Sequence, residues 1–131
     1  MYMPPEILER AVNATYKGVA ADIFSLGVIL WILHFGSPPF LNASSTDRNY
    51  TILQKNVDAF WRLHPAVRKY QGGEIDNDFK QLLVSMLSRD PVNRPETIDS
   101  VMSHAFFTKE NDLITPTMNK WADSEAMYTA F

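Results

Sequence analysis

The sequence predicts a mostly α-helical domain, on three observations. No stretch alternates apolar and polar residues in the manner of a half-buried β-strand. A long, almost wholly apolar segment at 20–35 has the composition of a helix buried on all sides. Apolar residues also recur three and four positions apart, the spacing of one helix face, in three further segments: 47–64, 76–87 and 96–107. At 131 residues the chain is long enough to bury a modest core.

The N-terminal residues predict a short helix. Pro4 and Pro5 suit the first turn of a helix, and Glu6 suits its positive end. Residues 11–19 have the composition of a connecting loop, and a polar, turn-rich stretch at 42–47 follows the apolar segment.

The apolar segment is predicted to be the central helix of a soluble core. Gly36 can supply the left-handed stop at its end, and Pro38 forbids its continuation. Its 16 residues fall short of the ~20 that a bilayer requires. It also carries three polar side chains: Asp22, Ser25 and His34. We interpret His34 as a hydrogen-bonded core histidine rather than a ligand.

The later helices are separated by glycine and proline. The helix at 47–64 is expected to end before Pro65, and Gly72 and Gly73 precede the next helix. The turn that contains Pro91 and Pro95 precedes the last one.

Composition excludes several function classes. The net charge of −3 offers no electrostatic footprint for nucleic acid or an anionic membrane surface. The absence of cysteine excludes disulfides and thiolate metal sites, and the three histidines show no His-Glu-x-x-His spacing, so we expect no metal site. The first residues have neither a basic stretch nor an apolar core of a signal peptide. We expect an intracellular, cytoplasmic protein.

Four short segments are more informative in combination than each is alone. Alone, Tyr-Met-Pro-Pro-Glu (2–6) is a helix start, Asp-Ile-Phe-Ser-Leu-Gly (22–27) is a capped helix, and Ser-Arg-Asp-Pro-Val-Asn-Arg-Pro (88–95) is a turn. In this order, and with His-Ala-Phe-Phe at 104–107, they resemble the C-terminal lobe of a eukaryotic protein kinase domain. The segment 2–6 is similar to the end of the family's activation segment. The resemblance covers 1–107 and leaves 108–131 as a C-terminal tail.

The resemblance implies structural anchors. Glu6 is expected to pair with Arg94 and so hold the end of the activation segment against the last helices, because a guanidinium binds a carboxylate through two parallel bonds. Asp22 is expected to accept hydrogen bonds from the backbone of the catalytic loop, and Gly27 belongs to the same motif at the start of the central helix. That loop is absent from the sequence.

The resemblance also implies what the chain lacks. Ile29 and Leu33 match the base of the apolar column that reaches the ATP adenine in the family. The chain has no glycine-rich phosphate loop, no Val-Ala-Ile-Lys lysine, no His-Arg-Asp and no Asp-Phe-Gly. We therefore expect no catalytic, nucleotide-binding or metal-binding residue here, and expect ATP and magnesium only in a full-length parent.

The resemblance further implies surfaces for proteins. Phe60 and Trp61 are interpreted as core or interface packing, with a docking role for substrates or regulatory proteins as the alternative. Four residues are expected to face a peptide substrate: Tyr2, Met3, Pro4 and Pro5.

Departures from the family pattern are small. Pro4 stands for the usual alanine, Phe24 for tryptophan and Ala105 for proline. Tyr2-Met3 and the His-Ala-Phe-Phe ending favour the serine/threonine branch, with a calcium/calmodulin-dependent-like group as one candidate.

Two functions remain open from the sequence. The first is a lobe fragment of a serine/threonine kinase that supplies substrate-side and structural elements only. The second is a non-catalytic docking or interaction module. Without the helix that precedes it in the family, the central helix is expected to leave Ile23, Leu26 and Leu30 partly uncovered, which would promote self-association.

Overall fold

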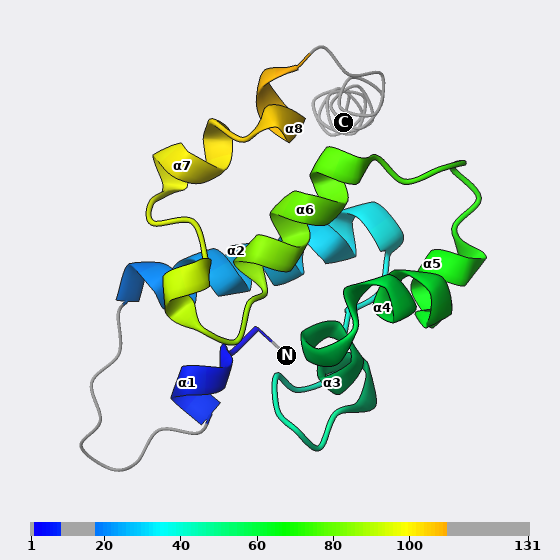
Figure 1. Ribbon diagram of the computed structural model, residues 1–131, viewed down its shortest axis with the longest axis horizontal. Coiled ribbons are helices and arrows are strands. Elements are labelled where there is room, and N and C mark those ends of the chain that lie inside the picture. The colour runs from blue at the N-terminus through cyan, green and yellow to red at the C-terminus, as the bar shows by residue number, and fades with distance from the viewer. Residues whose placement is uncertain (1, 9–17, 110–131) are drawn as a thin grey trace, which may run out of the picture.

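The computed structural model describes residues 2–8 and 18–109, and every regular element in these ranges is helical (Figure 1). The predicted tail beyond 109 and most of the predicted loop lie outside the described residues. The elements are α1 (Pro5–Leu8), α2 (Gly18–Phe35), α3 (Arg48–Lys55), α4 (Val57–Leu63), α5 (Pro65–Lys69), α6 (Asn77–Met86), a 3₁₀ turn η1 (Pro91–Asn93), α7 (Ile98–Met102) and α8 (Ala105–Thr108).

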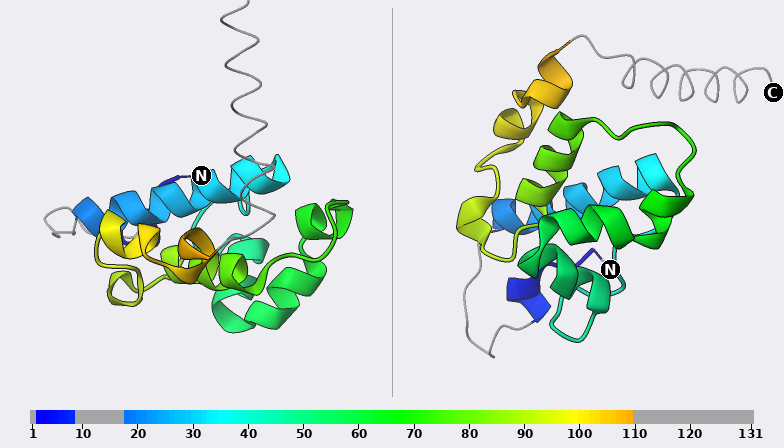
Figure 2. Two further views of the ribbon diagram at one scale, coloured as in Figure 1. Left: turned by 90° about the horizontal axis from the view of Figure 1, so that it is seen from above. Right: turned by 45° about the vertical axis from the view of Figure 1, so that its right-hand side comes forward.

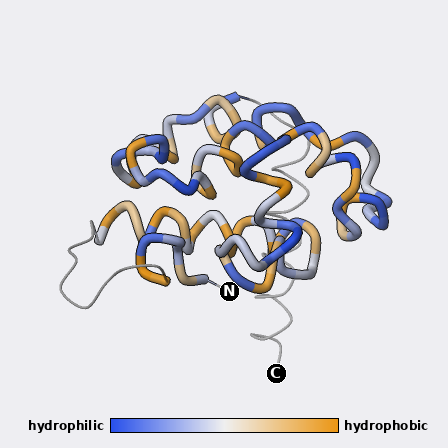
Figure 3. Tube along the Cα trace, turned by 60° about the horizontal axis from the view of Figure 1, so that its bottom comes forward, coloured by the Kyte–Doolittle hydropathy of each residue, from blue (hydrophilic) through white to orange (hydrophobic). Residues whose placement is uncertain are grey.

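Helix α2 is the longest element, and the helices from α3 to α8 lie to one side of it (Figure 2, left). Apolar residues run along most of α2, whereas the other helices alternate apolar and polar positions (Figure 3). The main core lies where α2 meets α4 and α6, and its largest fully buried side chains are Phe24, Val28, Trp31, Phe40, Tyr50, Phe60, Leu83 and Leu87.

The prediction for the uncovered face of α2 needs a correction. Ile23 is fully buried, because it packs with Leu82, Met86 and Val101 of α6 and α7. Leu26 and Leu30 are half-buried. The open face lies instead along Asp22, Ile29 and Leu33, at helical spacing.

Helix α2 is 18 residues long, two more than the sequence predicts. By length and composition alone it is apolar enough to cross a membrane, a test that core helices also pass, and a third of it is buried in the structure. Its packing against α6 supports the interpretation as a core helix.

Two predicted helices are each divided by a capping residue. In the segment 47–64, Asn56 ends α3 and also begins α4, where its side chain accepts a hydrogen bond from the Ala59 N–H. In the segment 96–107, His104 separates α7 from α8, and its Nδ1 accepts from the Phe106 N–H. Both breaks place a side-chain acceptor at an N-cap, which the apolar spacing alone does not reveal.

Candidate functional site

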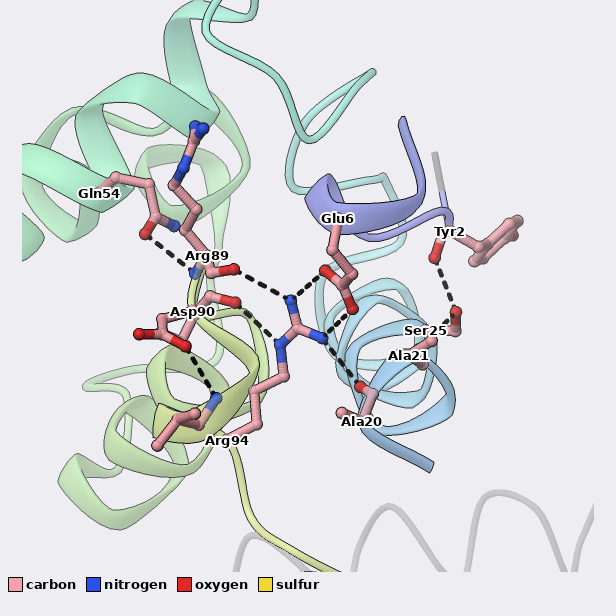
Figure 4. Close-up of polar contacts among 11 residues, drawn as sticks. Tyr2, Glu6, Ala20, Ala21, Ser25, Gln54, Arg89, Asp90 and Arg94 are labelled. Atoms are coloured by element: carbon pink, nitrogen blue, oxygen red, sulfur yellow. Dashed lines mark hydrogen bonds and ion pairs between the residues drawn. The ribbon is translucent and has the colours of Figure 1, made fainter. Parts of the chain in front are cut away.

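Arg94 is the centre of the most strongly bonded site that the structure describes. Its guanidinium lies between α1, α2 and the turn at η1, and its side chain is fully buried. Nη1 donates to Glu6 Oε1 at 2.7 Å and Nη2 donates to Glu6 Oε2 at 2.8 Å (Figure 4). The pairing of Glu6 with Arg94 expected from the sequence is therefore present, as a bidentate ion pair.

Three backbone carbonyls complete the surroundings of the guanidinium. Nη1 also donates to the Ala20 carbonyl at 3.0 Å, Nε to the Ser88 carbonyl at 2.9 Å and Nη2 to the Arg89 carbonyl at 3.4 Å. The guanidinium carbon lies 4.9 Å from the centre of the Phe24 ring. One planar side chain thus joins α1, the start of α2 and the turn after α6, which a lysine ammonium could not reproduce.

The turn that presents Arg94 is itself fixed by side chains. Asp90 caps η1 by accepting from the Val92 N–H at 3.0 Å. From α3, Gln54 donates to the Leu87 carbonyl and accepts from the Arg89 N–H. The sequence motif revealed the turn, but no local signal in the sequence pointed to Gln54.

The ionisation of Glu6 follows from this geometry. Partial burial tends to raise the pKa of the Glu6 carboxyl. The hydrogen bonds and positive charge of Arg94, with a backbone hydrogen bond, outweigh that effect and lower its pKa below the ordinary value. Glu6 is therefore the charged partner of Arg94 at neutral pH.

A second contact ties the N-terminal segment to α2, next to an open hollow. Ser25 Oγ donates to the Tyr2 carbonyl at 2.7 Å, a link that the sequence motif contained but did not assign (Figure 4). Beside it lies a hollow of about 550 Å³, lined by Tyr2, Met3, Pro4, Ile7, Gly18, Ala21, Asp22 and Ser25.

The hollow contains some of the residues expected to face a substrate. Tyr2 and Met3 are about half exposed and lie on its wall. Pro4 is buried but lines it. Pro5 is buried as the first residue of α1 and does not line the hollow.

Asp22 and Gly27, the other two expected anchors, are in opposite situations. The Asp22 side chain is exposed and accepts no hydrogen bond from any residue that the structure describes. Gly27 is buried where α2 crosses α6, and a Cβ at this position would lie only 2.9 Å from Met86 Cβ. Gly27 therefore permits a close approach of the two helices.

Ile29 and Leu33 are exposed on the same face of α2 as Asp22, at 41% and 49%. Phe60 and Trp61, by contrast, are 2% and 8% exposed and both pack on Trp31. The interpretation as core packing is correct for both. Neither ring is exposed, so a docking role at these residues would run through the grooves that they line rather than through an exposed aromatic surface.

Buried His64 and partly buried His34 both pack in the core. His64 Nε2 lies 2.6 Å from the Pro39 carbonyl and its Nδ1 accepts from the Ala66 N–H, which assigns the proton to Nε2. Burial lowers the pKa of His64, and burial also lowers that of His34. His34 packs among Phe35, Tyr70 and Phe79, but its buried Nε2 has no partner in the described part of the chain, so the expected hydrogen bond at that atom is absent.

The described residues offer no metal centre: within 2–8 and 18–109, no three His, Asp or Glu side chains are grouped so as to hold an ion. Asp76 and Asp78, at the start of α6, both bind Lys109 and so tie the end of α8 to that helix. These acids act in a structural ion pair.

Comparisons with known proteins identify the class. Residues 1–107 match the family model for the protein kinase domain, so the chain belongs to that family. It is 32% identical over 119 residues to a calcium and calcium/calmodulin-dependent serine/threonine-protein kinase of Lilium longiflorum, and covers 20% of its length. It is 31% identical over 111 residues to calcium-dependent protein kinase 1 of Oryza sativa subsp. japonica, and covers 19% of that chain.

A further relative is serine/threonine-protein kinase PLK4 of Xenopus laevis, 29% identical over 123 residues. These alignments cover 88%, 85% and 94% of this chain. Since the chain spans a fifth or less of each relative, it is related to serine/threonine protein kinases through one part of their length.

Proposed function

We propose that this chain forms the helical C-terminal lobe of a serine/threonine protein kinase, and that it supplies substrate-side and structural elements to a parent enzyme. The observation that carries the proposal is the bidentate Glu6–Arg94 pair. It joins the segment that resembles the end of the activation segment to the turn that resembles the family's Asp-Pro-x-x-Arg-Pro, 88 positions away.

In the proposed role, the N-terminal segment forms part of the surface that receives a protein substrate. Glu6 fixes this segment to the turn at η1, and Ser25 fixes its Tyr2 carbonyl to α2. Tyr2 and Met3 would then face the peptide from the wall of the 550 Å³ hollow. Two independent ties on a short segment hold such a surface in one conformation before the peptide binds, which lowers the entropic cost of binding.

Asp22 would serve the catalytic loop of the parent. Its carboxylate is at the edge of the hollow and is exposed, so it is open to backbone N–H donors from another part of a longer chain. Ile29 and Leu33, exposed along the same face of α2, would be covered by the parent's apolar column.

The described residues do not fit ATP or magnesium. Phosphoryl transfer needs donors around the phosphates, acidic ligands for the metal and a group that accepts the hydroxyl proton. The sequence contains none of the four motifs that supply them, and the described acids form no metal-binding group. We assign the binding of ATP and magnesium to the parent enzyme.

The reading frame upstream of Met1 tests the proposal. We expect it to encode the glycine-rich loop, the lysine, His-Arg-Asp and Asp-Phe-Gly, and we expect the extended chain to phosphorylate serine or threonine peptides. Asp22→Ala should then lower kcat strongly in the extended chain. A transcript that begins at Met1, or an upstream frame without those motifs, would contradict the proposal.

A non-catalytic interaction module is the second candidate, favoured by the exposed apolar residues Ile29 and Leu33 on α2. Capture of one specific protein by the 131-residue chain, with loss of capture in Ile29→Gln, would favour it. Val92→Gln is the matched control, because Val92 is equally apolar, 79% exposed and remote in sequence from α2.

A further inference from the structure

A groove between α4 and α6 lies outside the site described above. Its volume is about 670 Å³, within the range of pockets that bind ligands. Nine residues line it: Val57, Asp58, Trp61 and Arg62 of α4, and Asn77, Lys80, Gln81, Val84 and Ser85 of α6.

Trp61 lines this groove with its indole ring. The side chain is more than nine-tenths buried, and its Nε1 atom is itself buried and has no acceptor among the described residues. Trp61 therefore gives the groove a rigid aromatic wall rather than an open hydrogen-bond donor.

The charged side chains along the groove are mostly positive. Arg62 comes from one wall and Lys80 from the other, and neither forms an ion pair with a described residue. The Lys80 ammonium lies 5.6 Å from the centre of the Trp61 ring, which brings a positive charge close to the unpaired indole. Asp58 is the single acid among the described lining residues.

The amides of Asn77 and Gln81 add further donors on the α6 wall. Val57 and Val84 give the groove an apolar component. A bound group that suits this lining has a carboxylate for the two cations and an adjacent apolar side chain.

We propose that the α4–α6 groove binds an acidic peptide segment of a partner protein, with a carboxylate placed between Lys80 and Arg62 and an apolar side chain beside the Trp61 ring. The charge of the two cations selects an acidic peptide over a neutral one. The proposal does not depend on the kinase role, because no residue of this groove contributes to the Arg94 site or to the hollow beside it.

The test uses the ¹⁵N-labelled 131-residue chain and two short acetylated, amidated peptides. One has the sequence Glu-Glu-Leu-Glu-Glu-Ala, and the other has glutamine in place of every glutamate. The indole ¹H–¹⁵N resonance of Trp61, assigned from the Trp61→Phe spectrum, should shift on addition of the acidic peptide, whereas that of Trp31 should stay in place. The glutamine peptide should bind at least about tenfold more weakly, as expected for loss of charge complementarity.

Substitutions distinguish binding at the groove from a general effect of surface charge. Lys80→Gln and Arg62→Gln should each weaken binding of the acidic peptide by about tenfold, and added salt should weaken that binding further. Lys69→Gln removes the same charge from an exposed residue outside the groove and should leave the affinity unchanged. Trp61→Phe keeps an aromatic ring in the wall of the groove, and should weaken binding less than either charge change.

Several results would overturn the proposal. They are equal binding of both peptides, an unmoved Trp61 resonance, equal weakening by Lys69→Gln, and a spectrum without the dispersed resonances of a folded chain. Shifts of the groove resonances that depend on protein concentration without peptide would assign the groove to a second copy of the chain, and would also overturn it.

Discussion

Arg94 and Asp22 resemble anchors of the same domain, yet the structure treats them in opposite ways. Arg94 is buried, with bonds to one carboxylate and three backbone carbonyls. Asp22 lies near the start of α2, is exposed and accepts no bond from a described residue. The partners of Arg94 all lie in this chain, whereas the partner that the family resemblance implies for Asp22 does not. An anchor residue therefore stabilises the isolated chain only when both partners of the contact belong to that chain.

The largest expected effect comes from breaking the Arg94 site. Arg94→Ala should destabilise the chain by ~3–5 kcal/mol, because it leaves a partly buried Glu6 carboxylate and three carbonyls without their donor. Arg94→Lys keeps the positive charge but loses the planar guanidinium. Its free energy of unfolding should lie between that of Arg94→Ala and that of the unsubstituted chain. Urea unfolding followed by circular dichroism measures both.

Asp22→Ala is the matched control for Arg94. An exposed group without a partner should change the free energy of unfolding by less than ~0.5 kcal/mol. Equal losses at Arg94 and Asp22 would contradict the comparison between the two anchors.

The next effect concerns the crossing of α2 and α6. Gly27→Ala would place a Cβ 2.9 Å from Met86 Cβ and 3.1 Å from Leu87 Cδ2, and should destabilise the chain by ~1–3 kcal/mol through overpacking. Gly18→Ala, in the same helix but with nothing within 4 Å, should be neutral or slightly stabilising. If both variants unfold at the same denaturant concentration, the close approach at Gly27 is not what makes glycine necessary there.

The buried histidines predict an acid-sensitive core. Because the pKa of His64 and that of His34 are lowered in the folded chain, the unfolded chain binds protons more readily. Their contribution to stability is full above the ordinary histidine pKa of ~6.5 and is lost as the pH falls through the lower folded pKa. Glu6, with its lowered pKa, adds a second loss at more acidic pH. Thermal unfolding between neutral and acidic pH measures both steps.

His64→Gln separates the contribution of His64 from that of His34. Glutamine retains a donor for the Pro39 carbonyl but does not titrate. The variant should lose part of the upper pH step and keep the lower one. An unchanged upper step would assign the whole effect to His34.

The sequence predicted the helical class from its apolar spacing, and the Glu6–Arg94 pair from the motifs that carry the resemblance to the kinase family. It missed the division of the 47–64 helix at Asn56, since a side-chain cap does not interrupt the apolar spacing. It also placed Ile23 on the open face, an expectation that followed from the family helix missing before α2. The sequence of α2 could not correct this expectation, because an almost uniformly apolar helix gives no period from which to tell its buried side from its exposed side.

The smallest expected change in stability, and a large change in association, belong to the open face of α2. Ile29→Gln combined with Leu33→Gln should alter the free energy of unfolding by less than ~0.5 kcal/mol per site, because both side chains are already about half exposed. The same pair should reduce self-association, since it removes the apolar stripe beside Asp22. Val28→Ala, on the buried face, should instead cost ~1–3 kcal/mol without reducing association. Sedimentation velocity at several concentrations, together with urea unfolding, distinguishes the two faces. Persistent association of the double variant would assign the contact to a different surface.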